Sequence, residues 1–470
     1  MQKSVRQAWD SEILPSLTDF VAIPALSPAF DADWATSGHL DAAAEHLRGW
    51  LAGRDIPGAT VEILTLPGLS PVVLMDVPAS AGVPDDAGTA LLYGHLDKQP
   101  PFGEWSAGLG PWTPVRRDNR LYGRGAVDDG YSGYAATAAI EAVLAAGGRH
   151  ARCVLVLETS EESGSPHLPP YLEHLRERLG DVSLVVCLDS GGWDYDRLWL
   201  STSLRGLTSA DVTVRVLPSG LHSGMASGVV PSSFRVFRAL LDRLEDSATG
   251  RVLLPAMDVE IPADRIAEAT GAVQAAPGVA TGAYRPVDGM RLVSEDEVEL
   301  LLNNTWRPTL SVIGAAGFPD PADAGNVLRP YSTFKLSFRL PPTADANAAL
   351  EAVRTAVTTD VPYGAQVELN HTEASPGWNA PPLAPWLRST LDSLSQEVFG
   401  NQWGTVGIGG SIPFMAMLAE TYPRAQFVVT GAAGRDSNTH VPDEWLNLDQ
   451  AARVSQSVAL VLDAHAGRDR

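Results

Sequence analysis

Two adjacent glutamates, Glu161 and Glu162, follow the apolar run CVLVL at residues 153–157. The stretch that holds them, ETSEESGS, contains no basic residue. Burying a carboxylate that has no partner of opposite charge costs free energy. If the apolar run is a buried strand, these two carboxylates require a positive charge from elsewhere in the molecule.

Other acidic and histidine residues also stand where predicted apolar strands end. They are His95 and Asp97 after residues 89–94, Asp189 in SLVVCLDSG (183–191), and His440 in the loop that follows AQFVVTGAAG (425–434). Ligand sites of open α/β sheets lie beyond the carboxyl ends of the strands. Each residue alone also fits a cap, a turn or a solvated loop. Together they suit a pair of divalent ions, and the imidazoles favour zinc.

His95 and Asp97 are two positions apart, so on a strand their side chains point the same way. The Asp97 carboxylate could then hold the second ring nitrogen of His95, as carboxylates do beside metal-bound histidines. An H-x-D pair also occurs by chance, and a histidine hydrogen-bonded at a strand end is the alternative.

The stretch LYGRGAVDDG, residues 121–130, places Asp128 and Asp129 at the start of a predicted helix. Gly123 and Gly125 allow a tight loop there. Phosphate-binding loops also contain G-x-G, but two carboxylates at the helix start would repel a phosphate group. This argues against a nucleotide site, and helix capping is the alternative to a metal-binding role.

Strand-like and helix-like segments alternate over the first 200 residues, and these segments must position the residues named above. This order predicts an α/β domain with a central, mostly parallel sheet covered on both faces. The middle of the chain has the β-α-β-β-α-β order of a ferredoxin-like α+β domain, with an irregular insertion at about 250–305. We predict a larger domain made of residues 1–205 and 381–470 and an inserted domain at 206–380.

The composition excludes some classes of partner. The 470-residue chain has a net charge of −22, which argues against nucleic acid or an anionic membrane surface. The N-terminus lacks an apolar signal-peptide core, and no run approaches the length of a membrane span. Cys153 and Cys187 lie in apolar runs; one disulfide is the alternative, but they are interpreted as two buried thiols in a reducing cytoplasm. We expect a cytoplasmic protein.

Taken in order, the motifs resemble the aminoacylase/carnosinase superfamily of co-catalytic zinc metallopeptidases (clan MH), which includes glutamate carboxypeptidases and succinyl-diaminopimelate desuccinylase. The resemblance spans almost the whole chain and is closest to the carnosinase-like dipeptidase branch. It is carried by GHLD, LYGRGAVDDG, TSEESGS, CLDSG, LHSG, NVLRP with SFRLPP, GGSIP and DSNTH. It implies a zinc-peptidase-like catalytic domain and a lid or dimerisation domain at 206–380.

The resemblance also implies a role for each residue of the metal centre. His95 and Asp189 would hold one zinc ion, Glu162 and His440 the other, and Asp128 would bridge both across a cis peptide bond to Asp129. Glu161 corresponds to the general base, and Asp97 to the partner of His95. Manganese or cobalt could replace zinc.

The lid is implied to complete the site. His222 matches a residue that stabilises the oxyanion, often from the second subunit of a homodimer, although some relatives imitate that subunit with an insertion of their own. From the residues alone, His222 would be a surface loop histidine. Asn326 and Arg339 match substrate-holding residues, and Arg339 suits a bidentate grip on a carboxylate. Gly409, Gly410 and Ser411 match a loop that binds the C-terminal end of the substrate.

Two pairs of residues depart from the family pattern. Gly130 and Tyr131 stand where relatives have Lys-Gly, and Gly407 and Ile408 stand where carnosinase-like dipeptidases have Arg-Glu. That glutamate holds the free amino group of the dipeptide, and an isoleucine cannot pair with an ammonium group. The substrate's acyl side is therefore expected to be apolar, blocked or held differently.

These features predict a di-zinc hydrolase that cleaves dipeptides or other small peptides with a free C-terminal carboxylate. An aminoacylase or carboxypeptidase acting on N-acyl amino acids is the alternative within the enzyme class. A catalytically inactive, metal-binding regulatory protein is the alternative from another class, and the intact Glu161 argues against it.

Overall fold

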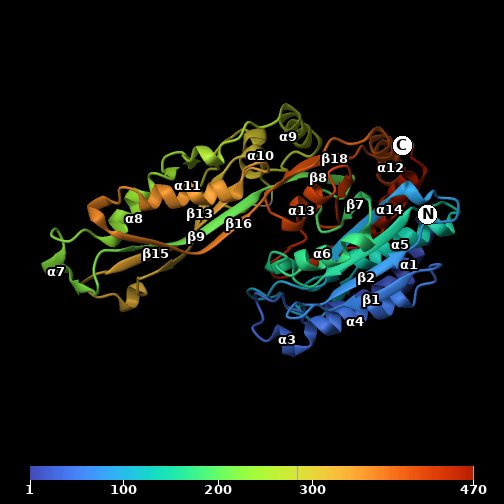
Figure 1. The fold of residues 1–470 in the computed structure, drawn as a ribbon, viewed down its shortest axis with the longest axis horizontal. Helices are drawn as coiled ribbons and strands as arrows, with labels where there is room; N and C mark the ends of the chain where they lie inside the picture. Colours follow the sequence, from blue (N-terminus) through green and yellow to red (C-terminus); the bar gives the residue numbers. More distant parts are fainter. Residues whose placement is uncertain (283, 469–470) are drawn as a thin grey trace.

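The computed structural model describes residues 1–282 and 284–468. The chain forms two lobes along the long axis of the molecule, and both termini lie in the larger lobe (Figure 1). Among the described residues, no helix is both long enough and apolar enough to cross a membrane.

The larger lobe is built on a six-stranded sheet with the order β1-β2-β6-β3-β7-β19. Strand β2 runs antiparallel to both neighbours, whereas the β6–β3, β3–β7 and β7–β19 pairs are parallel. The sheet is mixed but mostly parallel, as predicted. Its strands are β1 (Thr60–Leu64), β2 (Val72–Val77), β3 (Thr89–His95), β6 (Arg152–Glu158), β7 (Val182–Cys187) and β19 (Gln426–Val429).

Both faces of this sheet are buried, because successive residues of a strand point into two different cores. Leu92 of β3 packs into one core and its neighbour Tyr93 into the other. This explains why the strands are continuously apolar in sequence. The first core contains α4 (His39–Ala52), α5 (Ser132–Ala145) and α14 (Leu448–Gly467), and the second contains α6 (Leu168–Leu179) and α13 (Pro413–Thr421).

Further elements complete the larger lobe. A small sheet with the order β20-β5-β4 lies beside the loop that holds Asp128. The larger lobe also contains α1 (Gln2–Ala8), α2 (Leu14–Val21), α3 (Trp34–Ser37), β4 (Val115–Arg117), β5 (Arg120–Tyr122), α12 (Pro385–Phe399) and β20 (Trp445–Asn447).

The smaller lobe, or lid, has a four-stranded antiparallel sheet with the order β13-β15-β9-β16. Helices α8 and α11 share its apolar core. This confirms the predicted ferredoxin-like order. The elements are β9 (Gly206–Arg215), α8 (Ser233–Leu241), β13 (Thr309–Ala316), β15 (Tyr331–Leu340), α11 (Ala346–Thr358) and β16 (Gln366–Ser375).

The expectation of an irregular insertion at 250–305 is wrong for two of its stretches. Residues Ala263–Ala275 form helix α9 and Glu297–Thr305 form helix α10. Their apolar residues pack against a small sheet with the order β17-β8-β18, away from the core of the lid. This sheet lies between the two lobes (Figure 1). Its strands are β8 (Trp199–Leu204), β17 (Trp378–Asn379) and β18 (Gly404–Ile408).

Candidate active site

The residues predicted as metal ligands meet at one edge of the central sheet. In the parallel register, His95 of β3 pairs with Glu158 of β6, and Cys187 of β7 pairs with Val429 of β19. The carboxyl ends of these four strands therefore lie side by side. The predicted site residues follow directly: His95 ends β3, Glu161 and Glu162 form a 3₁₀ turn after β6, Asp189 follows β7, and His440 lies in the loop after β19.

His95 faces three carboxylates. Its Nε2 atom lies 3.4 Å from Asp128 Oδ1, 3.7 Å from Asp189 Oδ1 and 3.9 Å from Glu161 Oε2. The other ring nitrogen, Nδ1, lies 3.0 Å from the main-chain oxygen of Asp97. Because a carbonyl can only accept, Nδ1 carries the proton in that hydrogen bond and the lone pair of Nε2 faces the carboxylates.

His440 faces the other side of the same cluster. Its Nε2 atom lies 2.8 Å from Asp128 Oδ2 and 3.3 Å from Glu162 Oε2. The two oxygens of Asp128 thus point to different histidines, and the Asp128–Asp129 peptide bond is cis. This is the arrangement that a bridging ligand between two ions requires.

The donor set fits divalent cations. His95 Nε2 and Glu162 Oε1 are buried and make no hydrogen bond with the described residues. Ligands around one tetrahedral zinc ion lie roughly 3.3–3.6 Å apart, close to the 3.4 and 3.7 Å that separate His95 Nε2 from Asp128 and Asp189. Donor atoms lie within 4.8 Å of one another in two groups, His95 with Glu161 and Asp189, and His95 with Asp128 and Glu162.

The pKa shifts of the clustered side chains also indicate a site for cations. Burial and the charge of Asp189 raise the pKa of Glu161 well above its usual range. Burial and the charge of Asp128 raise the pKa of Glu162 to about 7. Burial lowers the pKa of His440, but hydrogen bonds to Asp128 and Glu162 outweigh it and raise this pKa to about 11. The raised pKa values of these two acids and of this histidine, and the lowered pKa of Asp128 beside both histidines, all indicate that the cluster favours positive charge.

Asp97 holds the cluster in a different way from the one predicted. Its carboxylate lies 3.6 Å from His95 Nδ1, beyond hydrogen-bond distance, and the closer partner of the ring is the Asp97 main-chain oxygen. The carboxylate instead accepts the backbone N–H groups of Glu161 at 3.1 Å and of Glu162 at 3.0 Å. Asp97 therefore fixes both His95 and the turn that presents the two glutamates.

Sequence reasoning missed a buried ion pair that joins two ligand loops. Arg124 Nη1 lies 2.6 Å from Glu444 Oε2, and both side chains are at most 1% exposed. Glu444 Oε1 also accepts the backbone N–H groups of Gly125 at 2.9 Å and Val127 at 3.2 Å. Since Arg124 precedes Asp128 and Glu444 follows His440, this pair fixes the two loops relative to each other. In the sequence, only the charged residues of LYGRGAVDD and HVPDEW indicated that such a pair could form.

The departure at Tyr131 has a structural reason. Its buried hydroxyl donates to the Leu188 oxygen at 2.6 Å and accepts the Ala432 N–H at 2.9 Å. It thus links the loops after β7 and β19, which carry Asp189 and His440. The same loops touch at Gly191, where a Cβ atom would lie 2.1 Å from the Ala433 oxygen, so no larger residue fits.

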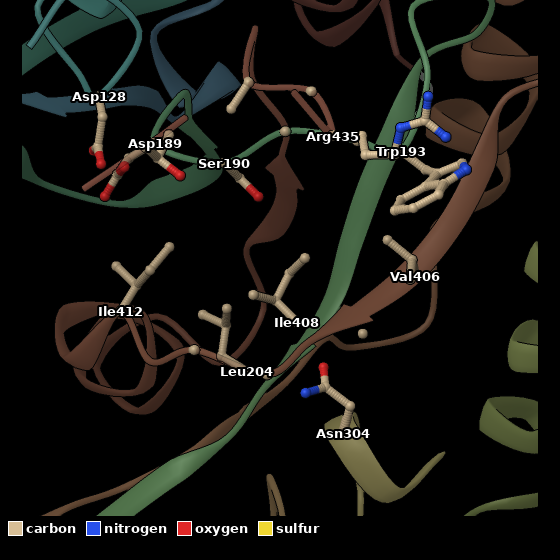
Figure 2. Close-up of a pocket in the computed structure, with 18 of the residues that line it drawn as sticks. Asp128, Asp189, Ser190, Trp193, Leu204, Asn304, Val406, Ile408, Ile412 and Arg435 are labelled. Carbon is tan, nitrogen blue, oxygen red and sulfur yellow. The ribbon is translucent and has the colours of Figure 1, made fainter. Parts of the chain in front are cut away.

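A cavity of about 520 Å³ opens beside the cluster, with Asp128, Glu161, Asp189 and His440 in its wall. Figure 2 shows Asp128 and Asp189 at one side of this space and Ile408, Val406 and Trp193 across from them. The predicted substrate-binding residues Ile408, Gly409, Gly410 and Ser411 all line it.

Arg339 reaches this cavity wall from the lid. Its Nη1 atom donates to Ser411 Oγ at 3.1 Å. Arg205, which sequence reasoning missed, braces the same loop: its Nε donates to the Gly409 oxygen at 3.0 Å, and its own main-chain oxygen accepts the Ser411 hydroxyl at 2.6 Å. Burial and the charge of Arg339 lower the pKa of Arg205 to about 10. Two neighbouring guanidinium groups that contact the Gly409–Ser411 loop favour an anion beside this loop.

His222 and Asn326 lie elsewhere. They are exposed neighbours on a two-stranded ribbon of the lid, β10 (Leu221–His222) and β14 (Val327–Leu328), where the Ser223 N–H donates to the Asn326 oxygen at 2.9 Å. The adjoining helix α7 (Ser223–Ala226) lies at the end of the lid that is farthest from the larger lobe (Figure 1). The structure therefore does not bring these two residues to the ligand cluster of their own chain.

Comparison with known proteins agrees with this geometry. The model of peptidase family M20/M25/M40 matches residues 91–464. The chain belongs to this family. It is 28% identical over 377 residues to a cysteinylglycine-S-conjugate dipeptidase of Corynebacterium striatum, covering 79% of each chain. These matches confirm the resemblance that the motifs carry.

Solved structures of the M20 fold superpose over nearly the whole chain. Human carnosine dipeptidase 1 gives a TM-score of 0.76 at 23% identity, with 100% of both chains covered. An M20 family metallo-carboxypeptidase from Sulfolobus solfataricus gives 0.79 at 20% identity, covering 97% of this chain and 100% of the other. The two-lobed architecture described above is thus the fold of this peptidase family.

Proposed function

We propose that this protein hydrolyses the amide bond of dipeptides or other small peptides with a free C-terminal carboxylate, using two divalent metal ions. The supporting observation is the cluster in which Asp128 lies between His95 and His440, with buried donor atoms that lack other partners. His95 and Asp189 would hold one ion, Glu162 and His440 the other, and Asp128 both. The imidazoles favour zinc, and manganese or cobalt suit the carboxylates. When bound, the ions supply Lewis acidity toward the scissile carbonyl and the attacking water.

The two adjacent glutamates have different surroundings, which supports different duties. Glu162 accepts a hydrogen bond from Gln99 at 2.7 Å and faces His440. The Glu161 carboxylate lines the cavity and receives no hydrogen bond from the described residues. Glu161 is therefore placed to take a proton from water at a carboxylate oxygen and to pass it to the leaving amine.

The substrate carboxylate would bind at Ser411 and Arg339. A guanidinium group can grip a carboxylate with two parallel hydrogen bonds. Arg205 adds a second positive charge next to the first, which strengthens the attraction for an anion at this end of the cavity. The substrate would thus be held by its C-terminal residue, which carries the leaving amine.

We also propose a homodimer through the lid, whose limits we place at residues 206–380. His222 and Asn326 adjoin helix α7, at the end of the lid farthest from the larger lobe (Figure 1), so we assign their role to a partner's site. Light scattering at several concentrations tests this, and a monomer with full activity would exclude the role of His222. A cytoplasmic location is supported by the buried free thiols of Cys153 and Cys187.

The alternative substrate class is N-acyl amino acids, and Ile408 is the observation that favours it. This residue lines the cavity where an acid would be needed for a free amino group. Hydrolysis of free dipeptides and their N-acyl counterparts by the zinc- or manganese-loaded protein separates the two classes. Cleavage of the acylated set alone would identify an aminoacylase. If neither set is cleaved although two ions bind, the protein is regulatory.

Glu161→Gln is the control for this experiment. It removes the proton acceptor but preserves the size of the side chain, so activity should fall at least about 100-fold. Metal content, measured by elemental analysis, should stay at two ions per chain. Undiminished activity of this variant would show that another group is the base.

A further inference from the structure

The end of the cavity opposite the predicted metal ligands is apolar. Val406 and Ile408 come from β18, Trp193 from the loop after Asp189, and Leu301 from helix α10. Val279, in the turn after α9, completes this wall. Two of these five side chains therefore belong to the insertion at 250–305. Figure 2 shows Trp193, Val406 and Ile408 around one space, with Asn304 of α10 at its border.

The wall is held rigidly. The turn after α9 presses on the Trp193 indole so closely that a Cβ atom on Gly282 would lie 2.7 Å from its ring. The guanidinium group of Arg435 lies 5.1 Å from the centre of the same ring. Val279 packs with Trp193 in the apolar cluster that also contains Leu301 and Val406. A surface fixed in this way loses little conformational entropy when a ligand binds.

Charge distinguishes this end of the cavity from the others. The carboxylates that line the cavity are Asp128, Glu161 and Asp189, all in the predicted metal cluster. The carboxylate of the substrate is accounted for by Ser411 and Arg339. The apolar end is left for the group on the acyl side of the scissile bond. A charged group at this end would lose hydration and would gain no partner of opposite sign other than the exposed Arg435.

We infer that the insertion at 250–305 builds an acyl-side subsite for an uncharged, apolar group about the size of a leucine or phenylalanine side chain. This rests on the proposed function, and it adds Val279, Leu301 and Trp193 as residues that determine specificity. It also gives the insertion a role, because helix α10 and the turn after α9 supply Leu301 and Val279 to the cavity that β18 lines.

The test uses a series of substrates with one constant C-terminal residue and a varied acyl residue: glycyl, leucyl, phenylalanyl, lysyl and aspartyl, each free and N-acetylated. The metal-loaded protein should show kcat/KM values at least about tenfold higher for leucyl and phenylalanyl than for the other three. Equal values across the series, or a preference for the lysyl or aspartyl compound, would overturn the inference.

Two matched variants locate the effect. Val279→Ala should reduce the leucyl-over-glycyl preference several-fold, mainly through KM. Val293→Ala makes the same change on the same insertion, at a side chain that is 83% exposed and does not line the cavity, and should leave the preference intact. Equal effects of both variants would also overturn the inference.

Ile408→Val provides an independent readout if Val279→Ala fails to fold, because it removes one methylene from another residue of the same wall, on strand β18. It should lower the ratio of the leucyl to the glycyl kcat/KM. Hydrolysis of none of the substrates by any variant would count against the proposed function itself. Hydrolysis without acyl preference would count against the subsite alone.

Discussion

Replacing Glu444 by Ala tests whether the buried ion pair positions the metal ligands. The substitution leaves the Arg124 guanidinium without its carboxylate in surroundings where both side chains are at most 1% exposed. Removing one partner of a buried pair costs about 3–5 kcal/mol of unfolding free energy. It also deprives the N–H groups of Gly125 and Val127 of their acceptor. Because these amides lie in the loop that carries Asp128, metal affinity should fall by about 10–100-fold.

Urea unfolding followed by circular dichroism would measure the first effect, and competition with a chelator the second. Glu173→Ala is the matched control, since Glu173 pairs with Arg176 on the surface, where the two side chains are 68% and 61% exposed. Its cost should stay below about 1 kcal/mol. A Glu444→Ala protein that matches this control in stability and binds metal normally would refute the argument.

The double variant Arg124→Met/Glu444→Leu separates the two contributions. Apolar residues in place of a whole buried pair often restore stability, because no uncompensated charge remains. The backbone amides before Asp128 would still lack an acceptor. Part of the unfolding free energy should therefore return while metal affinity stays low.

Three further predictions follow from the same contacts. Asp97→Ala should weaken metal binding about 10–100-fold in a chelator competition, because the Glu161–Glu162 turn loses two hydrogen bonds; unchanged affinity would contradict this. Gly191→Ala should lower the midpoint of thermal unfolding, since its Cβ would meet the Ala433 oxygen at 2.1 Å, and a wild-type midpoint would show that the loops can separate. Burial makes the pKa of His46 lower in the folded protein than in the unfolded chain. The neutral His46 ring therefore contributes its full share of the unfolding free energy above the unfolded-state pKa, and this share is lost as the pH falls through the folded-state pKa. The unfolding free energy of His46→Gln, measured by urea titration between pH 7.5 and 5, should therefore decline less on acidification than that of the wild type.

The strand ends were predictable because apolar runs of β-sheet length stop at acidic residues or histidine. Once the parallel order is assumed, His95, Glu162 and Asp189 must share an edge. The contacts that fix their geometry were not predictable in this way. Glu444 and Arg124 are 320 positions apart, and nothing local to either reports the other. The same holds for Arg205 beside Gly409.

The insertion was misjudged because its helices carry weak periodic signals. Helix α9 is rich in alanine, whose small side chains mark no clear apolar stripe, and it contains a glycine, Gly271. Helix α10 did have a readable start, since Asp296 caps it by accepting the Val298 N–H at 2.9 Å. Its buried Leu301 and Leu302 pack on β18, an element about 100 positions later in the chain, so sequence alone gave them no partner.

The predicted metal ligands and the proposed apolar subsite share two loops, and this limits how specificity can change. The loop after β7 carries both Asp189 and Trp193, and the loop after β19 carries both Arg435 and His440. The two loops are tied together where the Gly192 N–H donates to the Ala433 oxygen at 2.8 Å. A substitution at Trp193 would therefore disturb Asp189 as well as the acyl group. The insertion contacts the same space from the opposite side and carries none of the predicted ligands. Changes at Val279 or Leu301 can thus alter which acyl group fits while the metal centre keeps its geometry, which makes the insertion the part of the chain where substrate preference can vary independently of catalysis.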